Sequence, residues 1–333
     1  MPKVTLSSFP VSALFGVVKP SGPTSMSIVN DIQQLVARSR LFVDPEKLEK
    51  MKGKKLDRRR GKAGREAVKI GQGGTLDPLA DGVLVIGVGK GTKKLNEFLN
   101  CVKEYQTTCL LGCETDSYDC EGARVRLAPW QHVTREKVEV ALPQFTGEII
   151  QVPPIFSALK MDGKPLYEYA RKGIPLPRPI EGRKVTVHSL EIVKWLGRDH
   201  AFRWPEKQLS SEEKQALETA LKSVQEDASI NDEPEMASNS QIPTAFVLKM
   251  KVSGGTYVRS IVHDLAHSLG SAGHVVTLKR SRQGRFVLDP VEEDDQECVP
   301  WEVFEKALSD VGECDEDGWT EWEKNVMQRL NDV

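Results

Sequence analysis

The sequence predicts a mixed α+β fold. Apolar runs of strand length are separated by amphipathic helical segments and long connections, they do not alternate regularly with the helices, and no internal repeat is found. With 333 residues, of which 39% are hydrophobic and 28% charged, the chain has enough apolar material for one large domain or two modest ones. No apolar stretch approaches the length of a membrane span, so we expect no membrane association.

The first part of the chain predicts a strand, a turn, a helix and two more strands. Residues 15–19 form a short apolar run, and Pro20-Ser21-Gly22-Pro23 predicts a turn. A helix should follow with Ser25 or Ser27 as its N-cap. Its buried face comprises Ile28, Val29, Ile32, Leu35 and Val36. Apolar runs at 83–88 and 105–111 predict the next two strands.

The second part of the chain continues with alternating helices and strands. Residues 134–142 predict a short helix and 184–192 a strand. In residues 246–252 alternate positions are apolar, which indicates a half-buried strand. A helix then begins near Arg259 and ends at Gly270. Its buried face comprises Ile261, Val262, Leu265, Ala266 and Leu269.

Charge is strongly segregated along the chain, although the net charge is only −2. Residues 43–67 are rich in lysine and arginine, whereas residues 206–241 and 291–333 are acidic. We expect one domain over 1–290 that carries a basic insertion (43–67) and an acidic, flexible surface insertion (206–241) containing a helix. An acidic tail (291–333) follows, without the strand pattern of a PUA domain. Such segregation suits a protein with one polyanion-facing surface, and a solvated loop is the alternative for the basic segment.

The cysteines and the N-terminus favour an intracellular protein. None of the six cysteines forms a C-x-x-C pair, so neither a zinc ribbon nor a disulfide framework is indicated, and we expect free thiols in a reducing compartment. Residues 1–13 lack the apolar run of a secretory signal, and the absence of arginine before Arg38 gives little support to a mitochondrial presequence.

Three motifs invite functional interpretations that the sequence does not favour. Residues 85–92 resemble a nucleotide-binding glycine loop, but the lysine precedes the last glycine, so a tight strand-to-helix turn is expected. His263 and His267 have the spacing of a zinc-protease helix, but Asp264 replaces the usual glutamate and no third ligand is evident, so no metal site is predicted. Residues 167–171 form an ordinary amphipathic helix rather than an RNA-binding stripe.

A glycine-rich segment ending in an aspartate is the strongest candidate for chemistry. Residues 71–74 contain three glycines, which allow positive φ and close approach of a ligand to the backbone. Pro78 favours an extended conformation at Asp77, so one carboxylate is held on a stiff loop just before an apolar strand. Taken alone, the segment could equally be an Asp-Pro turn that caps the strand.

Seven segments, in the same order along the chain, resemble the TruB family of pseudouridine synthases. They are Lys19-Pro20 with Gly22, Thr24 and Ser25; residues 71–82; Lys103-Glu104-Tyr105; Leu111-Gly112 with Thr115, Asp116 and Asp119; residues 151–160 with 167–171; residues 255–260; and Leu278-Lys279-Arg280. The resemblance spans about residues 14 to 288. It implies the pseudouridine synthase fold, in which a mixed, mostly antiparallel central sheet is flanked by helices, loops and RNA-binding insertions.

The resemblance implies an enzyme that isomerises uridine to pseudouridine. The base leaves C1′ through its nitrogen and reattaches through carbon, without net redox change or hydrolysis, so no cofactor or metal is expected. A carboxylate can stabilise or capture the positive charge that develops on the sugar, and the resemblance gives this role to Asp77. The target uridine has to leave its stack to be reached, and the resemblance places Tyr105 against the flipped base.

The resemblance implies supporting roles for six further residues. Arg259 pairs with the aspartate, orients it and favours its ionised form. Tyr257 and Leu278 form walls of the pocket, whereas Lys19 and Lys160 are expected to contact phosphate. Gln72 replaces the family histidine that displaces the base from the stack. It retains an amide for hydrogen bonding but has no titratable ring.

Gln72 and the long basic insertion resemble the eukaryotic stand-alone branch, the tRNA pseudouridine-55 synthases. The expected partner is the T-arm of tRNA, messenger RNA is left open as a second substrate, and we expect a monomer in the nucleus, the mitochondrion or both. Two alternatives remain: an RNA-binding, tRNA-folding protein with secondary or lost catalysis, and a guide-RNA-dependent, dyskerin-like subunit. The dyskerin-like branch retains the histidine and carries a PUA domain, so it fits less well. A zinc hydrolase using His263 and His267 is a distant fourth hypothesis.

Overall fold

The computed structural model describes residues 9–51, 67–222, 230 and 241–333. The described chain forms two compact units: residues up to Lys103 together with Lys279–Val333 form the first, and Glu104–Leu278 form the second. The chain passes from one unit to the other within β4 (Lys103–Leu111) and again within β12 (Gly273–Gln283). No helix in the described ranges is long and apolar enough to cross a membrane.

The first unit is built around β1 (Ala13–Lys19) and β3 (Asp81–Val88), which pair antiparallel along their full lengths. On the other side of β3, the C-terminal part of β12 pairs in parallel through Lys279 and Arg280. Shorter strands extend this arrangement: β2 (Ile70–Gln72), β13 (Phe286–Val287), β14 (Gln296–Glu297), β15 (Val299–Pro300) and β16 (Asn331–Asp332). Both β1 and β3 are apolar at nearly every position because side chains pack against both of their faces.

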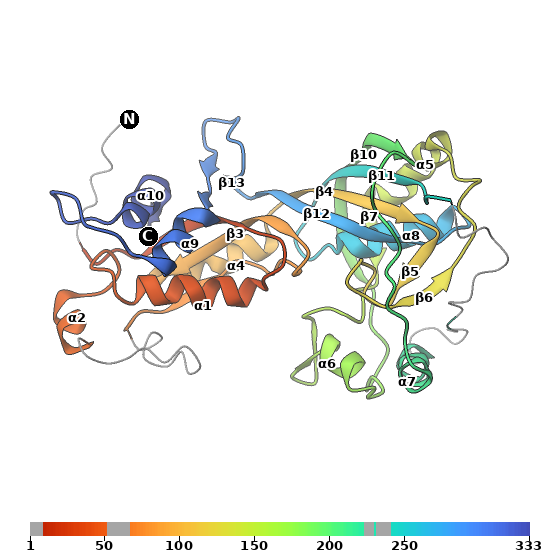
Figure 1. The fold of residues 1–333 in the computed structure, drawn as a ribbon, viewed down its shortest axis with the longest axis horizontal. Helices are drawn as coiled ribbons and strands as arrows, with labels where there is room; N and C mark the ends of the chain where they lie inside the picture. The colour runs from red at the N-terminus through yellow and green to blue at the C-terminus, as the bar shows by residue number, and fades with distance from the viewer. Residues whose placement is uncertain (1–8, 52–66, 223–229, 231–240) are drawn as a thin grey trace. The chain divides into compact units, whose positions relative to one another are not determined.

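Helices from both ends of the chain form the main core of the first unit. The helix α1 (Ser25–Val36) presents Ile28, Val29 and Ile32 to β1 and β3, as the apolar spacing predicts. The helices α9 (Trp301–Ser309) and α10 (Glu321–Arg329) lie close to β1 (Figure 1), and their residues Phe304 and Trp322 belong to the same cluster. The segment 291–333 is therefore acidic on its surface and apolar where it packs against β1. This unit also contains the helices α2 (Pro45–Met51), η1 (Gly89–Lys94) and α4 (Leu95–Asn100).

The strands of the second unit follow the order β12, β4, β11 (Ala245–Val252), β10 (Arg183–Gly197) and β7 (Gly147–Gln151). Both partners of β10 run antiparallel to it. Together with the parallel pairing of β12 with β3, the described sheet pairings are therefore mixed but mostly antiparallel, as expected. A hairpin of β5 (Cys113–Thr115) and β6 (Arg124–Leu127) follows β4. The helices α5 (Arg135–Ala141), η2 (Leu142–Phe145) and α8 (Val258–Ser268) pack nearby.

A small apolar cluster in the second unit holds the segment between β7 and β10. This segment contains the hairpin of β8 (Lys160–Met161) and β9 (Lys164–Pro165) and the helix α6 (Leu166–Arg171). The helix α7 (Ser211–Lys222) lies against α6 and confirms the helix predicted within residues 206–241. Residues 223–229 and 231–240 of that insertion, and most of the basic insertion 43–67, lie outside the described residues.

The structure corrects the predicted start of one helix and confirms the end of another. Thr24, rather than Ser25 or Ser27, caps α1, because its side-chain oxygen accepts the backbone N–H of Ser27 at 3.1 Å. Gly270, with φ +68°, follows α8 in the left-handed conformation that ends many helices. The predicted strands at 15–19, 83–88, 105–111, 184–192 and 246–252 are all present.

A buried histidine in β12 makes stability depend on pH. His274 is fully buried, and its Nδ1 lies 2.8 Å from the carbonyl oxygen of Cys113. Burial lowers the pKa of His274 to about 4, whereas an unfolded chain leaves it near 6.5. The unfolded state therefore binds the extra proton between these values, and stability present above pH 6.5 is lost as the pH falls towards 4, by up to about 3 kcal/mol.

This effect can be measured by urea unfolding at pH 7.0 and pH 4.5. We expect His274→Gln to reduce the difference in the free energy of unfolding between the two pH values, because glutamine cannot take up the proton. An unchanged pH dependence in the variant would assign the loss of stability to other groups. His188→Gln, at an exposed position of β10, is the matched control.

Candidate functional site

Asp77 lies in the first unit, on the loop that joins β2 to β3, and its side chain is half-buried. Two of the glycines that flank it are required by the backbone. Gly74 has φ +120°, and Gly82 has φ +106° with the carbonyl oxygen of Arg280 2.2 Å from where a Cβ would stand. The predicted glycine-rich loop therefore exists, with a fixed path before and after the aspartate.

The opening motif Lys19–Ser25 holds this loop through its main chain. The hydroxyl of Ser25 accepts the N–H of Leu76 at 2.8 Å and donates to the carbonyl of the same residue at 2.9 Å. The N–H of Gly22 donates to Pro78, and the hydroxyl of Ser21 donates to Leu79. Residues about 55 positions away thus fix the backbone on both sides of Asp77.

Two side chains from β12 hold the same loop from the other end. Arg280, which is almost fully buried, donates to the carbonyl oxygens of Val83 at 2.7 Å and Thr75 at 3.4 Å. The amide of Gln283 donates to the carbonyls of Gly73 and Phe98. The motif Leu278-Lys279-Arg280 therefore helps to hold the Asp77 loop in position through Arg280.

Lys19 does not have the position of a phosphate contact. Its side chain is fully buried, and its ammonium donates to the carbonyl oxygens of Pro20, Pro78 and Ala80 at 2.8, 3.1 and 2.6 Å. An ammonium has three N–H donors, and each of these carbonyls can accept one of them. The expectation of phosphate binding is corrected because the tertiary structure turns this lysine toward the backbone of the Asp77 loop.

The lysine of the motif Lys103-Glu104-Tyr105 behaves in the same way. Lys103 is buried, and its ammonium donates to the carbonyls of Phe98, Leu99 and Cys101 at 2.9 to 3.0 Å. Burial lowers the pKa of Lys103. It therefore holds the C-terminal end of α4, where a positive charge also complements the helix dipole.

Gln72 lies in β2 at the start of the Asp77 loop. Its amide nitrogen is 3.3 Å from the hydroxyl of Thr75, so it makes a local hydrogen bond within the loop. Its side-chain oxygen is buried without a hydrogen-bond partner among the described residues. The structure therefore leaves this oxygen as an unused acceptor, and a role toward substrate stays a prediction.

Arg259 lies at the start of α8 in the second unit and is 3% exposed. Its guanidinium donates to the carbonyl oxygens of Ser117 at 2.6 Å and Phe156 at 3.0 Å, and its Nε lies 3.7 Å from a carboxylate oxygen of Asp119. Asp119 and Phe156 belong to family-like segments to which the sequence assigned no role. Together they fix the orientation of this arginine.

The other predicted residues of the second unit differ in exposure. Gln151 accepts the N–H of Tyr257 at 2.7 Å and donates to its carbonyl at 2.9 Å, which fixes the residue that caps α8. Tyr105 and Leu278 are buried in β4 and β12, whereas Lys160 is exposed on β8. Lys160 therefore keeps the exposure that a phosphate contact needs.

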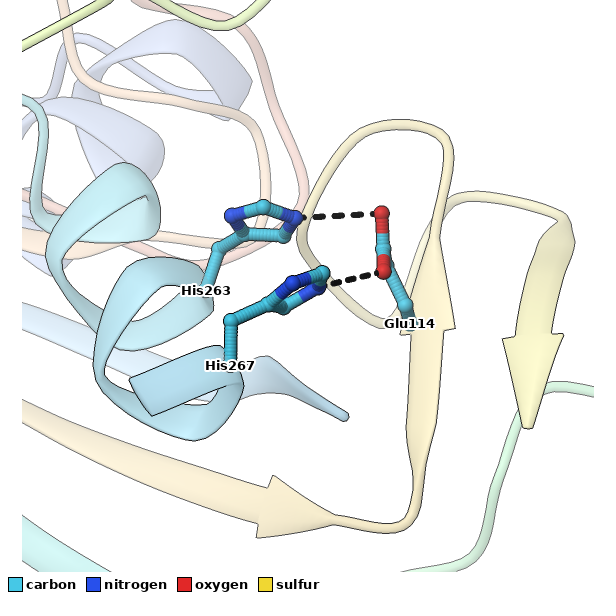
Figure 2. A group of neighbouring side chains, drawn as sticks. All are labelled: Glu114, His263 and His267. Atoms are coloured by element: carbon cyan, nitrogen blue, oxygen red, sulfur yellow. Dashed lines mark hydrogen bonds and ion pairs between the residues drawn. The ribbon is translucent and has the colours of Figure 1, made fainter. Parts of the chain in front are cut away.

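Glu114 is a third candidate metal ligand beside His263 and His267, which was not evident from the sequence. Glu114 of β5 faces both histidines of α8, with one oxygen 3.1 Å from Nε2 of His263 and the other 2.8 Å from Nε2 of His267 (Figure 2). Burial lowers the pKa of His263, but hydrogen bonds to Asp264 and Glu114 outweigh it and raise this pKa to about 9. Sequence spacing could not reveal Glu114, which is 149 positions before His263.

The other two weak motifs have the structures that the sequence favours. Residues 85–92 form the end of β3 and the first residues of the 3-10 helix η1, a tight strand-to-helix connection. Residues 167–171 belong to α6, where Tyr169 is buried and the guanidinium of Arg171 lies over the ring of Tyr167. Neither segment needs a functional explanation beyond packing.

Comparison with known proteins relates most of the chain to pseudouridine synthases. The tRNA pseudouridine synthase 4 of Schizosaccharomyces pombe is 34% identical, over 87% of this chain and 82% of that protein. The protein of the same name from Saccharomyces cerevisiae is also 34% identical, over 95% of this chain and 85% of that protein. A solved Cbf5–Nop10–Gar1 complex shares the fold, with a TM-score of 0.51 and 20% identity over 96% of this chain and 60% of the matched chain.

A family model agrees with these relatives. The TruB family pseudouridylate synthase (N terminal domain) model matches residues 60–211, which include the Asp77 loop and the segments around Tyr105, Asp119 and Gln151. The order of the motifs and the mixed, mostly antiparallel strand pairing point to the same family. The chain therefore belongs to the TruB family of pseudouridylate synthases.

Proposed function

We propose that this protein isomerises uridine to pseudouridine in the T-arm of tRNA, without a guide RNA, and that Asp77 is its catalytic carboxylate. The observation that carries the proposal is the Asp77 loop, whose backbone is fixed by Ser25, Lys19 and Arg280. A carboxylate on a backbone held this firmly is suited to one defined position at the reacting sugar. The chain covers more than four fifths of two relatives that are named tRNA pseudouridine synthases. Their names support tRNA as the substrate.

The chemistry needs only groups that this chain carries. The bond between C1′ and the base nitrogen breaks, the base turns, and a bond forms between C1′ and C5, while the proton of C5 is released and the nitrogen gains one. Asp77 stabilises or captures the positive charge at C1′. Tyr105 stacks on the displaced base and repays part of the cost of flipping it. Lys160 contributes a phosphate contact that positions the RNA.

The test uses the purified full chain and a synthetic T-arm hairpin with no other RNA. We expect pseudouridine at a single position, detected by nucleoside chromatography and located by chemical modification followed by reverse transcription. If the hairpin is bound but unmodified, and a guide RNA restores activity, the guide-dependent alternative is correct. If the protein binds the hairpin and accelerates its folding, but forms no pseudouridine with or without a guide RNA, the RNA-folding alternative is correct.

A substitution of Arg259 separates catalysis from RNA affinity. We expect Arg259→Lys to lower kcat by about 100-fold or more while the Kd for the T-arm changes by less than about threefold. An ammonium cannot reproduce the fork that donates to Ser117 and Phe156, and a side chain that is 3% exposed offers little to the RNA surface. The measurement pairs single-turnover kinetics with filter binding. Equal losses of rate and affinity would mean that Arg259 is a phosphate contact.

A further inference from the structure

We propose that Glu114, His263 and His267 bind a Zn²⁺ ion in the second unit. Figure 2 shows the two imidazole rings on one face of α8, each directed at the carboxylate that β5 presents. The candidate ligand atoms of the three residues lie within 4.8 Å of one another. Two histidines and one glutamate form a common three-ligand zinc set, which leaves a fourth position for water.

The distances between the ligand atoms fit a tetrahedral ion. With metal–ligand bonds near 2.0 Å, neighbouring ligand atoms around tetrahedral zinc are about 3.3 Å apart. The two N···O separations, each to a different oxygen of the Glu114 carboxylate, are 3.1 and 2.8 Å. One ligand atom from each of the three residues lies within 4.8 Å of the others, so the three side chains need to draw together around an ion. The imidazole ligands favour Zn²⁺ over Mg²⁺ and Ca²⁺, which prefer all-oxygen sites.

The surroundings of His263 match those of a zinc-bound histidine. Its second ring nitrogen, Nδ1, lies 2.9 Å from a carboxylate oxygen of Asp264, an outer partner that fixes ring orientation in many metal sites. The ring of Tyr118 stacks on it, with centroids 3.9 Å apart, although Tyr118 adopts φ +62°, which is rare for an aromatic residue.

Arg126 is the competing cation at the site. Its guanidinium lies 3.2 Å from both Glu114 and Nε2 of His267, and it also donates to the carbonyl of Ser271 at 2.6 Å. Nε2 of His267 carries either a proton, which it can donate to the carboxylate, or a lone pair, which can accept from the guanidinium. It therefore cannot bond to both partners at once. When zinc binds, we expect Arg126, which is about one-third exposed, to leave His267 and keep its bond to Ser271.

A zinc ion at this site would hold α8, the helix that carries Arg259, against β5. His263 and His267 lie one and two turns after Arg259 on α8, and Glu114 lies three residues before Ser117, whose carbonyl accepts from that arginine. His267 is 38% exposed, against 12% and 13% for His263 and Glu114, so an ion has access from the side of His267. A bound ion therefore joins α8 to β5 beside the contacts that orient Arg259.

The test measures metal binding by the purified full chain, with Zn²⁺ and, as a spectroscopic probe, Co²⁺. We expect one ion per chain, visible Co²⁺ absorption typical of four or five ligands, and slower hydrogen exchange in α8 when Zn²⁺ is added. His267→Ala should weaken binding by at least about 100-fold, since loss of an outer partner alone costs 10- to 100-fold. Arg126→Gln should strengthen binding, because it removes the competing cation without removing a ligand.

His188→Ala is the matched control, because this exposed histidine of β10 lies outside the cluster. Its metal content and affinity should equal those of the wild type. The proposal is overturned if wild-type protein binds no zinc, or if His267→Ala and His188→Ala bind it equally well. It is also overturned if Arg126→Gln, which keeps all three ligands, binds zinc no better than the wild type. Metal binding is scored without RNA, so these outcomes do not depend on the proposed pseudouridine synthase activity.

Discussion

Asp77→Asn is expected to abolish pseudouridine formation, with a loss of at least about 10³-fold in single-turnover rate. Asparagine has nearly the same shape, so the loop held by Ser25 and Lys19 should keep its path. What is lost is the negative charge that stabilises or captures the positive charge at C1′. The measurement is the rate of pseudouridine formation in a T-arm hairpin at saturating enzyme.

Binding and folding serve as internal controls for this variant. The Kd for the hairpin and the thermal unfolding midpoint should stay close to those of the wild type, because the removed charge is only half-buried. Asp81→Asn, which changes another half-buried aspartate at the start of β3, is the matched control and should retain most of the activity. An active Asp77→Asn protein would remove the catalytic assignment, whatever the family.

Lys19→Met is expected to lower kcat by about 100-fold with little change in RNA affinity. The ammonium holds the carbonyls of Pro78 and Ala80, directly after Asp77, and a displacement of the reacting group by about 1 Å can cost this much. Each buried carbonyl left without a donor also costs about 1–3 kcal/mol of stability. We therefore expect a lower unfolding midpoint together with the loss of rate, both measured on the same preparation.

The exposed Lys93 provides the comparison for this result, because Lys93→Met removes a lysine of the same unit without touching the Asp77 loop. It should leave both kcat and stability unchanged. If Lys19→Met instead weakens the Kd for the hairpin and leaves kcat intact, Lys19 contacts RNA after all. The rate should be compared below the lowered midpoint, so that unfolding does not count as lost catalysis.

The sequence was most informative where local rules decide the structure. The strands β1, β3 and β11 and the helices α1 and α8 follow from apolar periodicity, because each buries one face or both faces along a regular repeat. The glycine-rich loop around Asp77 was also predictable, since glycine is needed where φ is positive. The cap of α1 was missed by one residue, because Thr24, Ser25 and Ser27 are all capable caps and only the backbone path selects one.

By itself, then, the sequence determined the family, the main strands and helices between residues 13 and 270, and the aspartate that we propose as catalytic. Only the tertiary structure decided what the charged side chains around them do. Lys19 faces carbonyls 59 and 61 residues away instead of phosphate, and Glu114 meets two histidines about 150 residues later. A linear motif records which residue is present, whereas burial and distant partners fix whether its charge meets backbone, ligand or solvent.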